Sequence, residues 1–363
     1  MNEVADPIRA PTRANAALLA RALLADLPFH VLAALIFASC AVVFAVFGQA
    51  LDMDAIAVNA QLYAAGGITL ILFDVCATLA RERPRQPTRY LFDHYRDRVC
   101  DPGFITALLA LAVLIAFMPF FSALKSMIPR LNAFTWDATF IAWDRTLFLG
   151  QDAWRVIQPL FGYPLVTAAL AYLYHAWILL IYLGTLCLLF WRAAVPVRRQ
   201  YMVGFLLVWS VIGGCMAIAF ASVGPCFVGP ILGDQTFADQ MEYLEAANRE
   251  VPILTLPVQQ MLLDWHLSDT SGLGSGITAM PSMHVAMATL FWLAMRRVHR
   301  LAGRFFLGFL LVIWIGSVHL AYHYAVDGLV SVFAALVLWH LANQAIAWWD
   351  GQAFLRTNTV PAE

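Results

Sequence analysis

Charged residues are scarce in this chain of 363 residues: only 12% are Asp, Glu, Lys or Arg, whereas 62% are hydrophobic. An ordinary soluble domain is about 25% charged and about 45–50% apolar. The formal net charge of -1 provides no basic field of the kind that binds nucleic acid, so we expect no nucleic-acid partner. The composition predicts a polytopic membrane protein with an all-α fold.

Metal-binding and redox cysteine patterns are also missing. The six cysteines are scattered and no C-x-x-C occurs, so the sequence predicts neither a disulfide framework nor a zinc site, and we expect no metal and no cofactor. The segment 1–27 lacks a long apolar run, which argues against a cleaved signal peptide. Its arginines among alanines and leucines favour an amphipathic helix on the membrane surface.

Long apolar segments, by contrast, are abundant. A span needs about 20 mostly apolar residues. The second segment is the least secure because it contains Asn59, Gln61 and Asp74. The sixth and seventh are short. The eight expected spans are 28–49, 56–80, 103–123, 162–190, 201–222, 282–296, 305–321 and 323–348.

Basic residues indicate the orientation of these spans. When the loops are counted alternately, 17 of the 22 Lys and Arg fall on one side. The positive-inside rule then places both termini in the cytoplasm. We expect an N-terminal part (1–102), a catalytic membrane domain (103–348) and a cytoplasmic tail (349–363). A single lysine with many arginines and alanines hints at a GC-rich genome, which is consistent with a bacterial inner membrane.

Two long segments remain on the outer side. Residues 124–161 mix aromatic with charged residues, which is typical of amphipathic helices in the membrane interface. Asp137 and Asp144 could bind a polyol headgroup, but we expect them to form ion pairs with Arg145 or Arg155. Residues 223–281 end in a Gly-Ser stretch at 271–276, which we interpret as a hinge.

The most informative residues are ionisable groups at the outer ends of spans, where a membrane protein avoids them unless they act. Pro281-Ser282-Met283-His284 would begin the sixth span. Pro281 would lie in the first helical turn, and the Ser282 hydroxyl would donate a hydrogen bond to a phosphate. His323 and Asp327 are spaced i, i+4 and would share one helix face. A carboxylate on one ring nitrogen leaves the other free as nucleophile. His323 would attack phosphorus, Asp327 would orient it, and His284 would protonate the leaving group.

Pro-Ser-x-His at 281–284, followed by His-Tyr-x-Val-Asp at 323–327, resembles the type-2 phosphatidic acid phosphatase superfamily. The stretches Lys125–Pro129 and Trp143–Phe148 are similar to the inositol phosphorylceramide synthase (inositol phosphotransferase) branch. The resemblance covers roughly residues 103–345. It implies a six-helix phosphatase-like core preceded by two spans, a His284–His323–Asp327 triad and a covalent phosphohistidine.

The chain also departs from the phosphatase pattern. Lys-x6-Arg-Pro is absent, and Ser317 stands where an arginine is expected before the nucleophile. A transferring phosphoryl group needs stabilising donors. We therefore take as candidates the polar and basic residues on the outer side, with Lys125 first by the resemblance. The candidates for phosphate binding are Ser282, Lys125, His319, Arg130 and Arg145, with Arg155 and Arg249 also on that side.

Three functions fit these observations. The favoured one is a metal-independent transferase that passes inositol phosphate from a phosphatidylinositol-like donor to a ceramide- or diacylglycerol-like hydroxyl at the outer, periplasmic face. The second is a lipid phosphate phosphatase, with water as acceptor. The third is a non-enzymatic transporter or scaffold, against which the absence of paired internal repeats argues. His175 is interpreted as a packing residue rather than a functional one.

Overall fold

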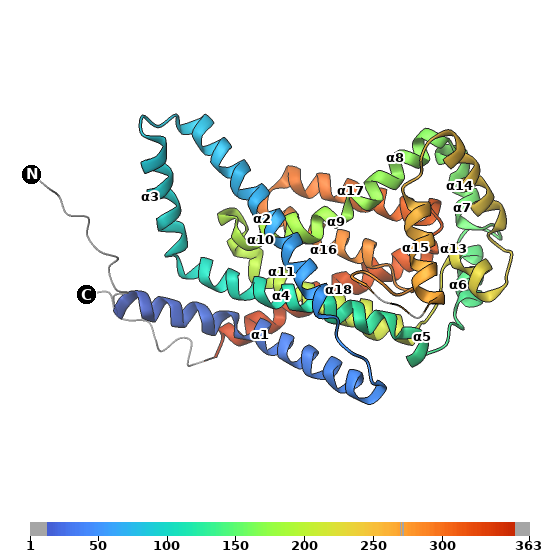
Figure 1. Ribbon diagram of the computed structural model, residues 1–363, viewed down its shortest axis with the longest axis horizontal. Helices are drawn as coiled ribbons and strands as arrows, with labels where there is room; N and C mark the ends of the chain where they lie inside the picture. The colour runs from blue at the N-terminus through green and yellow to red at the C-terminus, as the bar shows by residue number, and fades with distance from the viewer. Residues whose placement is uncertain (1–12, 269, 271, 353–363) are drawn as a thin grey trace, which may run out of the picture.

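The computed structural model describes residues 13–268, 270 and 272–352, and all regular structure in this part of the chain is helical (Figure 1). Among these residues, seven helical stretches are long and apolar enough to cross a membrane. The prediction of an all-α, multi-pass membrane bundle is confirmed. The seven stretches are Ala16–Phe47, Met53–Glu82, Pro102–Ser126, Pro164–Phe190, Arg192–Ala219, Arg300–His319 and Ala325–Asp350.

Five of the seven stretches are formed by single α-helices. These are α1 (Arg13–Phe47), α2 (Met53–Glu82), α4 (Pro102–Ser126), α17 (Arg300–His319) and α18 (Ala325–Asp350). The other two change helix type along their length, which is often a mark of functional sites. The first contains α8 (Pro164–His175), α9 (Trp177–Leu179), a π-helical segment (Leu180–Gly184) and α10 (Thr185–Phe190). The second contains a 3-10 turn (Arg192–Ala194), α11 (Val195–Leu207), a π-helical segment (Val208–Met216) and α12 (Ala217–Ala219).

The eighth expected span is α16 (Met283–Val298), which has 16 residues. At about 1.5 Å per residue it is shorter than the hydrocarbon layer of a bilayer, which is about 30 Å thick. Almost every residue from Met283 to Ala294 is buried, because α11, α17 and α18 pack around the helix. α16 is therefore the central helix of the bundle, and it is too short to count with the seven long spans.

The described part of the expected surface helix near the N-terminus is continuous with the first span. From Arg13 to Phe47 the chain is one continuous helix of 35 residues, with Pro28 inside it. Residues 13–27 therefore belong to the same helix as the first span, and a surface position for this segment stays a prediction. Residues 1–12 of that prediction lie outside the described part.

Polar residues of the second span have partners that explain their place in an apolar helix. Asn59 is fully buried, donates to the carbonyls of Leu114 and Ile115 on α4, and accepts from the hydroxyl of Tyr182. Asp74 accepts from Tyr95 and Arg98 of α3 (Pro87–Val99). A buried polar group is tolerated when it is hydrogen-bonded, and these contacts attach α2 to α3, α4 and the segment that contains Tyr182.

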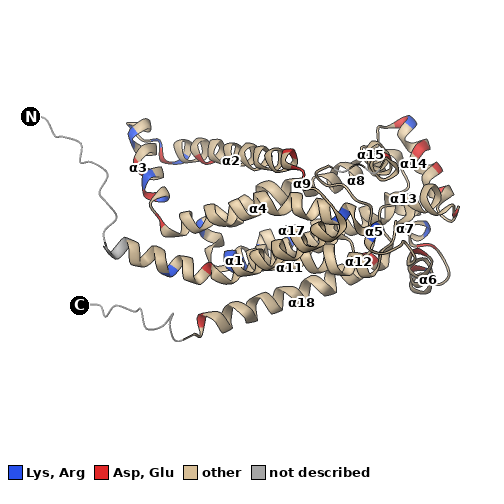
Figure 2. Cartoon of the chain, turned by 60° about the horizontal axis from the view of Figure 1, so that its bottom comes forward, with Lys and Arg blue, Asp and Glu red and all other residues tan. Residues whose placement is uncertain are grey.

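Short helices gather at one end of the bundle, and many arginines lie at the other (Figures 1 and 2). Arg199 there pairs with Asp26 and Asp350, which joins α11 to the first half of α1 and the end of α18. The short helices come from the two segments expected on the outer side. They are α5 (Ile128–Leu131), α6 (Asp137–Leu147), α7 (Ala153–Phe161), α13 (Pro225–Phe227), a π-helical segment (Val228–Leu232), α14 (Ala238–Glu250) and α15 (Thr255–Leu267).

Candidate active site

The beginnings of α16 and α18 meet at the end of the bundle that carries the short helices. His284 lies in the first turn of α16, and His323 lies just before α18 begins. The two imidazole rings have their centroids 6.4 Å apart, with an angle of 61° between their planes. The two histidines of the expected triad are thus close neighbours in space, although they are distant in the sequence.

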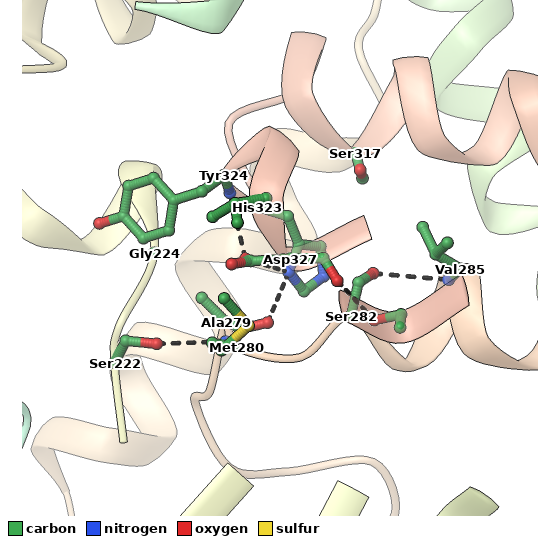
Figure 3. Close-up of polar contacts among 12 residues, drawn as sticks. Ser222, Gly224, Ala279, Met280, Ser282, Val285, Ser317, His323, Tyr324 and Asp327 are labelled. Carbon is green, nitrogen blue, oxygen red and sulfur yellow. Dashed lines mark hydrogen bonds and ion pairs between the residues drawn. The ribbon is translucent and has the colours of Figure 1, made fainter. Parts of the chain in front are cut away.

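His323 is oriented through one ring nitrogen (Figure 3). Its Nδ1 donates to the carbonyl of Ala279 at 2.8 Å and to Oδ2 of Asp327 at 3.1 Å. Both partners are acceptors, so Nδ1 carries a proton, and in the neutral ring Nε2 then has the free lone pair. No described residue forms a hydrogen bond with Nε2. The contacts therefore present a nucleophilic nitrogen on a ring that belongs to a residue only 6% exposed.

The contact between His323 and Asp327 arises in a different way from the expected one. α18 begins at Ala325, with Tyr324 as its N-cap, so His323 is not on the helix. Asp327 reaches back from the first turn, where Oδ2 accepts from the backbone N–H of Tyr324 at 3.1 Å as well as from His323. The same oxygen thus caps the helix and holds the imidazole. Asp327 is fully buried, and its Oδ1 has no hydrogen-bond partner among the described residues.

His284 is held by stacking on aromatic rings. Ser282 is the N-cap of α16, and its hydroxyl accepts from the N–H of Val285, so Pro281 precedes the cap and its expected place in the first turn is wrong. The ring of His284 stacks on Tyr174 at 4.2 Å and contacts Trp177 at 4.1 Å. Two large aromatic side chains from α8 and α9 therefore restrict the imidazole while leaving it partly exposed.

The loop before His323 is fastened to neighbouring segments by backbone hydrogen bonds. The carbonyl of Ser317 accepts from the N–H of His323, while its hydroxyl donates to the carbonyl of Trp314 within α17. Gly224 has φ of +87°, and a Cβ there would lie 2.6 Å from the carbonyl oxygen of Tyr322, so only glycine allows this approach. Ser317 thus supports the turn, but it does not replace the arginine expected at its position.

Two buried carboxylates from α6 anchor the start of α18. Asp144 accepts from the N–H groups of Ala325 and Val326, each at 2.8 Å. Asp137 accepts from the Tyr324 hydroxyl at 2.7 Å. Burial and the neighbouring Asp137 raise the pKa of Tyr324 well above its usual value, so this hydroxyl keeps its proton and donates. The first turn of α18, which carries Asp327, is thereby fixed to α6.

Asp137 also holds the segment next to the loop. It accepts from the N–H groups of Val223 and Gly224 at 3.0–3.1 Å.

Burial raises the pKa of Asp144 to about 6, although its two N–H donors act in the opposite direction. At neutral pH the Asp144 carboxyl is therefore mainly ionised, in the form that can accept both hydrogen bonds.

The prediction that Asp137 and Asp144 form ion pairs with arginines is therefore wrong. Arg145 pairs with Asp152 at 2.7 Å, and Arg155 pairs with Asp239 at 2.6 Å. The physical reason is that the free N–H groups of a helix start and of a loop lie at the buried face of α6, whereas the arginines face the exposed side. The sequence stretch Trp143-Asp144-Arg145 drew attention to Asp144. Nothing in the sequence showed that its carboxylate would accept hydrogen bonds from the N–H groups at the start of a helix.

The other predicted phosphate-binding residues lie at different distances from the two histidines. Lys125, near the end of α4, is close enough to His284 to interact with it electrostatically. Its side-chain ammonium has no hydrogen bond or ion pair with any described residue. A Cβ on Gly276 would lie 2.7 Å from the Lys125 backbone, so the chain at Gly276 packs directly on Lys125. Lys125 is the predicted cation that the structure brings near the site.

Arg130, Arg145 and His319 are engaged elsewhere. Arg130 donates to the Gln49 side chain and the Phe47 carbonyl at the end of α1. His319 is buried, and its Nε2 contacts the Thr167 hydroxyl at 2.8 Å. A phosphate-binding role for these three residues stays a prediction that their present contacts do not favour. His175 donates from Nδ1 to the carbonyl of Ala171 in its own helix, in keeping with a packing role.

Comparison with known proteins adds one finding to this geometry. The family model of the PAP2 superfamily matches residues 138–341, which is more than half of the chain. The chain belongs to the PAP2 superfamily. No curated protein and no solved structure matches it. Membership in the PAP2 superfamily is compatible with either phosphatase or phosphotransferase activity on membrane lipids.

The first prediction concerns the attachment of α18 in this PAP2 protein. Asp144→Asn replaces one accepting oxygen with an NH2 group, which leaves an N–H of Ala325 or Val326 without a partner. Loss of a buried acceptor costs about 1–3 kcal/mol, so we expect a lower melting temperature together with reduced turnover. Asp239→Asn is the matched control, because its exposed pair with Arg155 contributes at most about 1 kcal/mol. Equal melting temperatures and turnover in the two variants would contradict the anchoring role.

Proposed function

We propose that this PAP2 protein is a metal-independent lipid phosphotransferase that works through a phosphohistidine on His323. Support comes above all from one observation, the Nδ1 contact of His323 with Asp327 and Ala279, because it prepares Nε2 for attack beside a second histidine. In the first step Nε2 forms a bond to the donor phosphorus. The bond to the leaving lipid oxygen breaks, and His284 protonates that oxygen.

The second step reverses the roles of the groups. His284, now neutral, removes the proton from an incoming hydroxyl, whose oxygen attacks the phosphorus and breaks the bond to His323. The product is a phosphodiester, and both histidines return to their starting states. A well-placed acid or base contributes about 10²–10⁴-fold in rate. Lys125 is the cation best placed to balance the charge of the phosphoryl group.

The acceptor distinguishes transfer from hydrolysis. The favoured reaction moves inositol phosphate, or a similar phospho-alcohol, from a phosphatidylinositol-like donor to a ceramide- or diacylglycerol-like hydroxyl. Transfer is favoured by the aromatic packing of Tyr174 and Trp177 on His284, because a site that limits water protects a phosphohistidine. The missing arginine at Ser317 also separates this site from the simple phosphatase pattern. Hydrolysis of a lipid phosphate is the alternative.

We further propose that the site faces the outside of a bacterial inner membrane. The arginine-rich end of the bundle would lie in the cytoplasm by the positive-inside rule. Seven long spans together with the central α16 would return the end of the chain to the side on which it began. The short helices around His284 and His323 would then lie at the periplasmic face.

Substitution of the triad gives a graded prediction. His323→Ala should abolish turnover, because no other group is placed to accept the phosphoryl group. Asp327→Asn should lower turnover at least about 100-fold, by analogy with other histidines oriented by a carboxylate. The measurement is product formation by detergent-purified protein whose melting curve matches that of the unaltered chain. Full activity of His323→Ala would refute the nucleophile assignment.

A second prediction concerns metals. The proposed steps use only nitrogen and oxygen atoms of the protein and substrate, so treatment with EDTA followed by removal of the chelator should leave turnover unchanged. Restoration of a lost activity by Mg²⁺ or Zn²⁺ would contradict the proposed mechanism.

The reaction itself is tested with labelled phosphatidylinositol. Purified protein is incubated with this lipid, labelled in the inositol, either alone, with ceramide, or with a diacylglycerol whose acyl chains differ from those of the donor, and the labelled products are identified by mass spectrometry. We expect a new inositol lipid that depends on the acceptor and is absent with His323→Ala. Release of free inositol phosphate in every incubation would favour hydrolysis over transfer.

A further inference from the structure

An open cleft of about 300 Å³ lies at the arginine-rich end of the bundle, where α11, α16 and α18 come together. Arg297 is near the last residue of α16 and His284 near the first, so the cleft is about 20 Å from the catalytic histidines. The cleft therefore belongs to a different surface of the protein. It is lined by Gln200, Arg296, Arg297, Trp339, His340 and Asn343.

The two arginines of the cleft have no carboxylate partner among the described residues. Arg297 donates to Oε1 of Gln200, whose Nε2 in turn donates to the carbonyl of Trp339 at 2.9 Å. Arg296 lies over the ring of Trp292 at 4.9 Å. By contrast, Arg199 at the same end is neutralised by two aspartates. The cleft thus holds two guanidinium groups with uncompensated charge, and one of them is already oriented by Gln200.

An apolar surface leads away from the cleft along α18. Phe333, Leu336 and Val337 lie one to two turns before His340 and are exposed to 70%, 38% and 42%. Residues spaced by three or four positions share one helix face. The positive cleft therefore continues into a strip of side chains that faces lipid. A free phosphate ion would use only the polar part of this surface, whereas a phospholipid would use both parts.

We propose that this cleft binds the phosphate of an anionic phospholipid, with Arg296 and Arg297 contacting the phosphate and an acyl chain lying along Phe333, Leu336 and Val337. Arginine pairs with phosphate through several parallel hydrogen bonds. Basic pockets between membrane helices favour anionic headgroups for the same reason. The bound lipid ties together the ends of α16 and α18 farthest from the catalytic histidines, and it therefore stabilises the fold.

The test uses the full chain carrying His323→Ala, so that the lipid is bound without being consumed. Phosphatidylglycerol, phosphatidylcholine or inorganic phosphate is titrated into the detergent-solubilised protein, and the rise in melting temperature is measured. Arg296→Gln and Arg297→Gln are compared with Arg192→Gln, which removes an exposed charge from the same end but outside the cleft. The Arg296 guanidinium makes no hydrogen bond among the described residues, so its variant tests the charge without disturbing Gln200.

We expect phosphatidylglycerol to raise the melting temperature more than phosphatidylcholine or inorganic phosphate. Each cleft substitution should weaken the apparent affinity of the protein for phosphatidylglycerol about fivefold, which corresponds to about 1 kcal/mol per arginine. Arg192→Gln should leave this affinity unchanged. An equal loss in Arg192→Gln would overturn the proposal, because the effect would then be one of general charge. An equal response to inorganic phosphate or to phosphatidylcholine would also overturn it. The same titration of the unaltered chain provides a second measurement.

Discussion

The N–H groups at the start of α18 are bound by two carboxylates, and the geometry of the site depends on these bonds. Asp144 accepts hydrogen bonds from the N–H groups of Ala325 and Val326, and Asp327 accepts one from the N–H of Tyr324. Every helix start has such free donors, and here they are satisfied inside the protein by acids. Because Asp327 also accepts from Nδ1 of His323, the same carboxylate caps the helix and orients the His323 imidazole.

The two histidines of the proposed triad are supported by different physical means. His323 is held by directional hydrogen bonds, which fix its tautomer and expose Nε2. His284 is held by the faces of Tyr174 and Trp177, which restrict the ring without engaging its nitrogens. The first arrangement suits a group that must present one atom in one direction. The second suits a group that must give up and accept a proton.

Much of the fold and the central part of the site could be predicted from the sequence for identifiable reasons. The length of an apolar segment indicates directly whether it can span a membrane. Ionisable residues are so costly in a membrane that His284, His323 and Asp327 were recognisable as candidates. The roles of Asp137 and Asp144 could not be predicted, because their partners are backbone groups in distant parts of the sequence. The stacking of aromatic side chains on His284 was missed because such residues are common in any apolar span. The sequence did not show that residues 13–27 continue the helix of the first span.

The length of α16 has a consequence for the membrane itself. Its 16 residues rise about 24 Å, which is roughly 6 Å less than the thickness of a hydrocarbon layer. When Arg296 and Arg297 lie level with one set of headgroups, His284 sits beneath the opposite set. For the proposed transfer, a substrate phosphate would have to lie below the neighbouring headgroups, or the bilayer would have to be thinner around the bundle, for the phosphorus to reach His323. The proposed reaction would then take place in a layer that holds less water than the membrane surface.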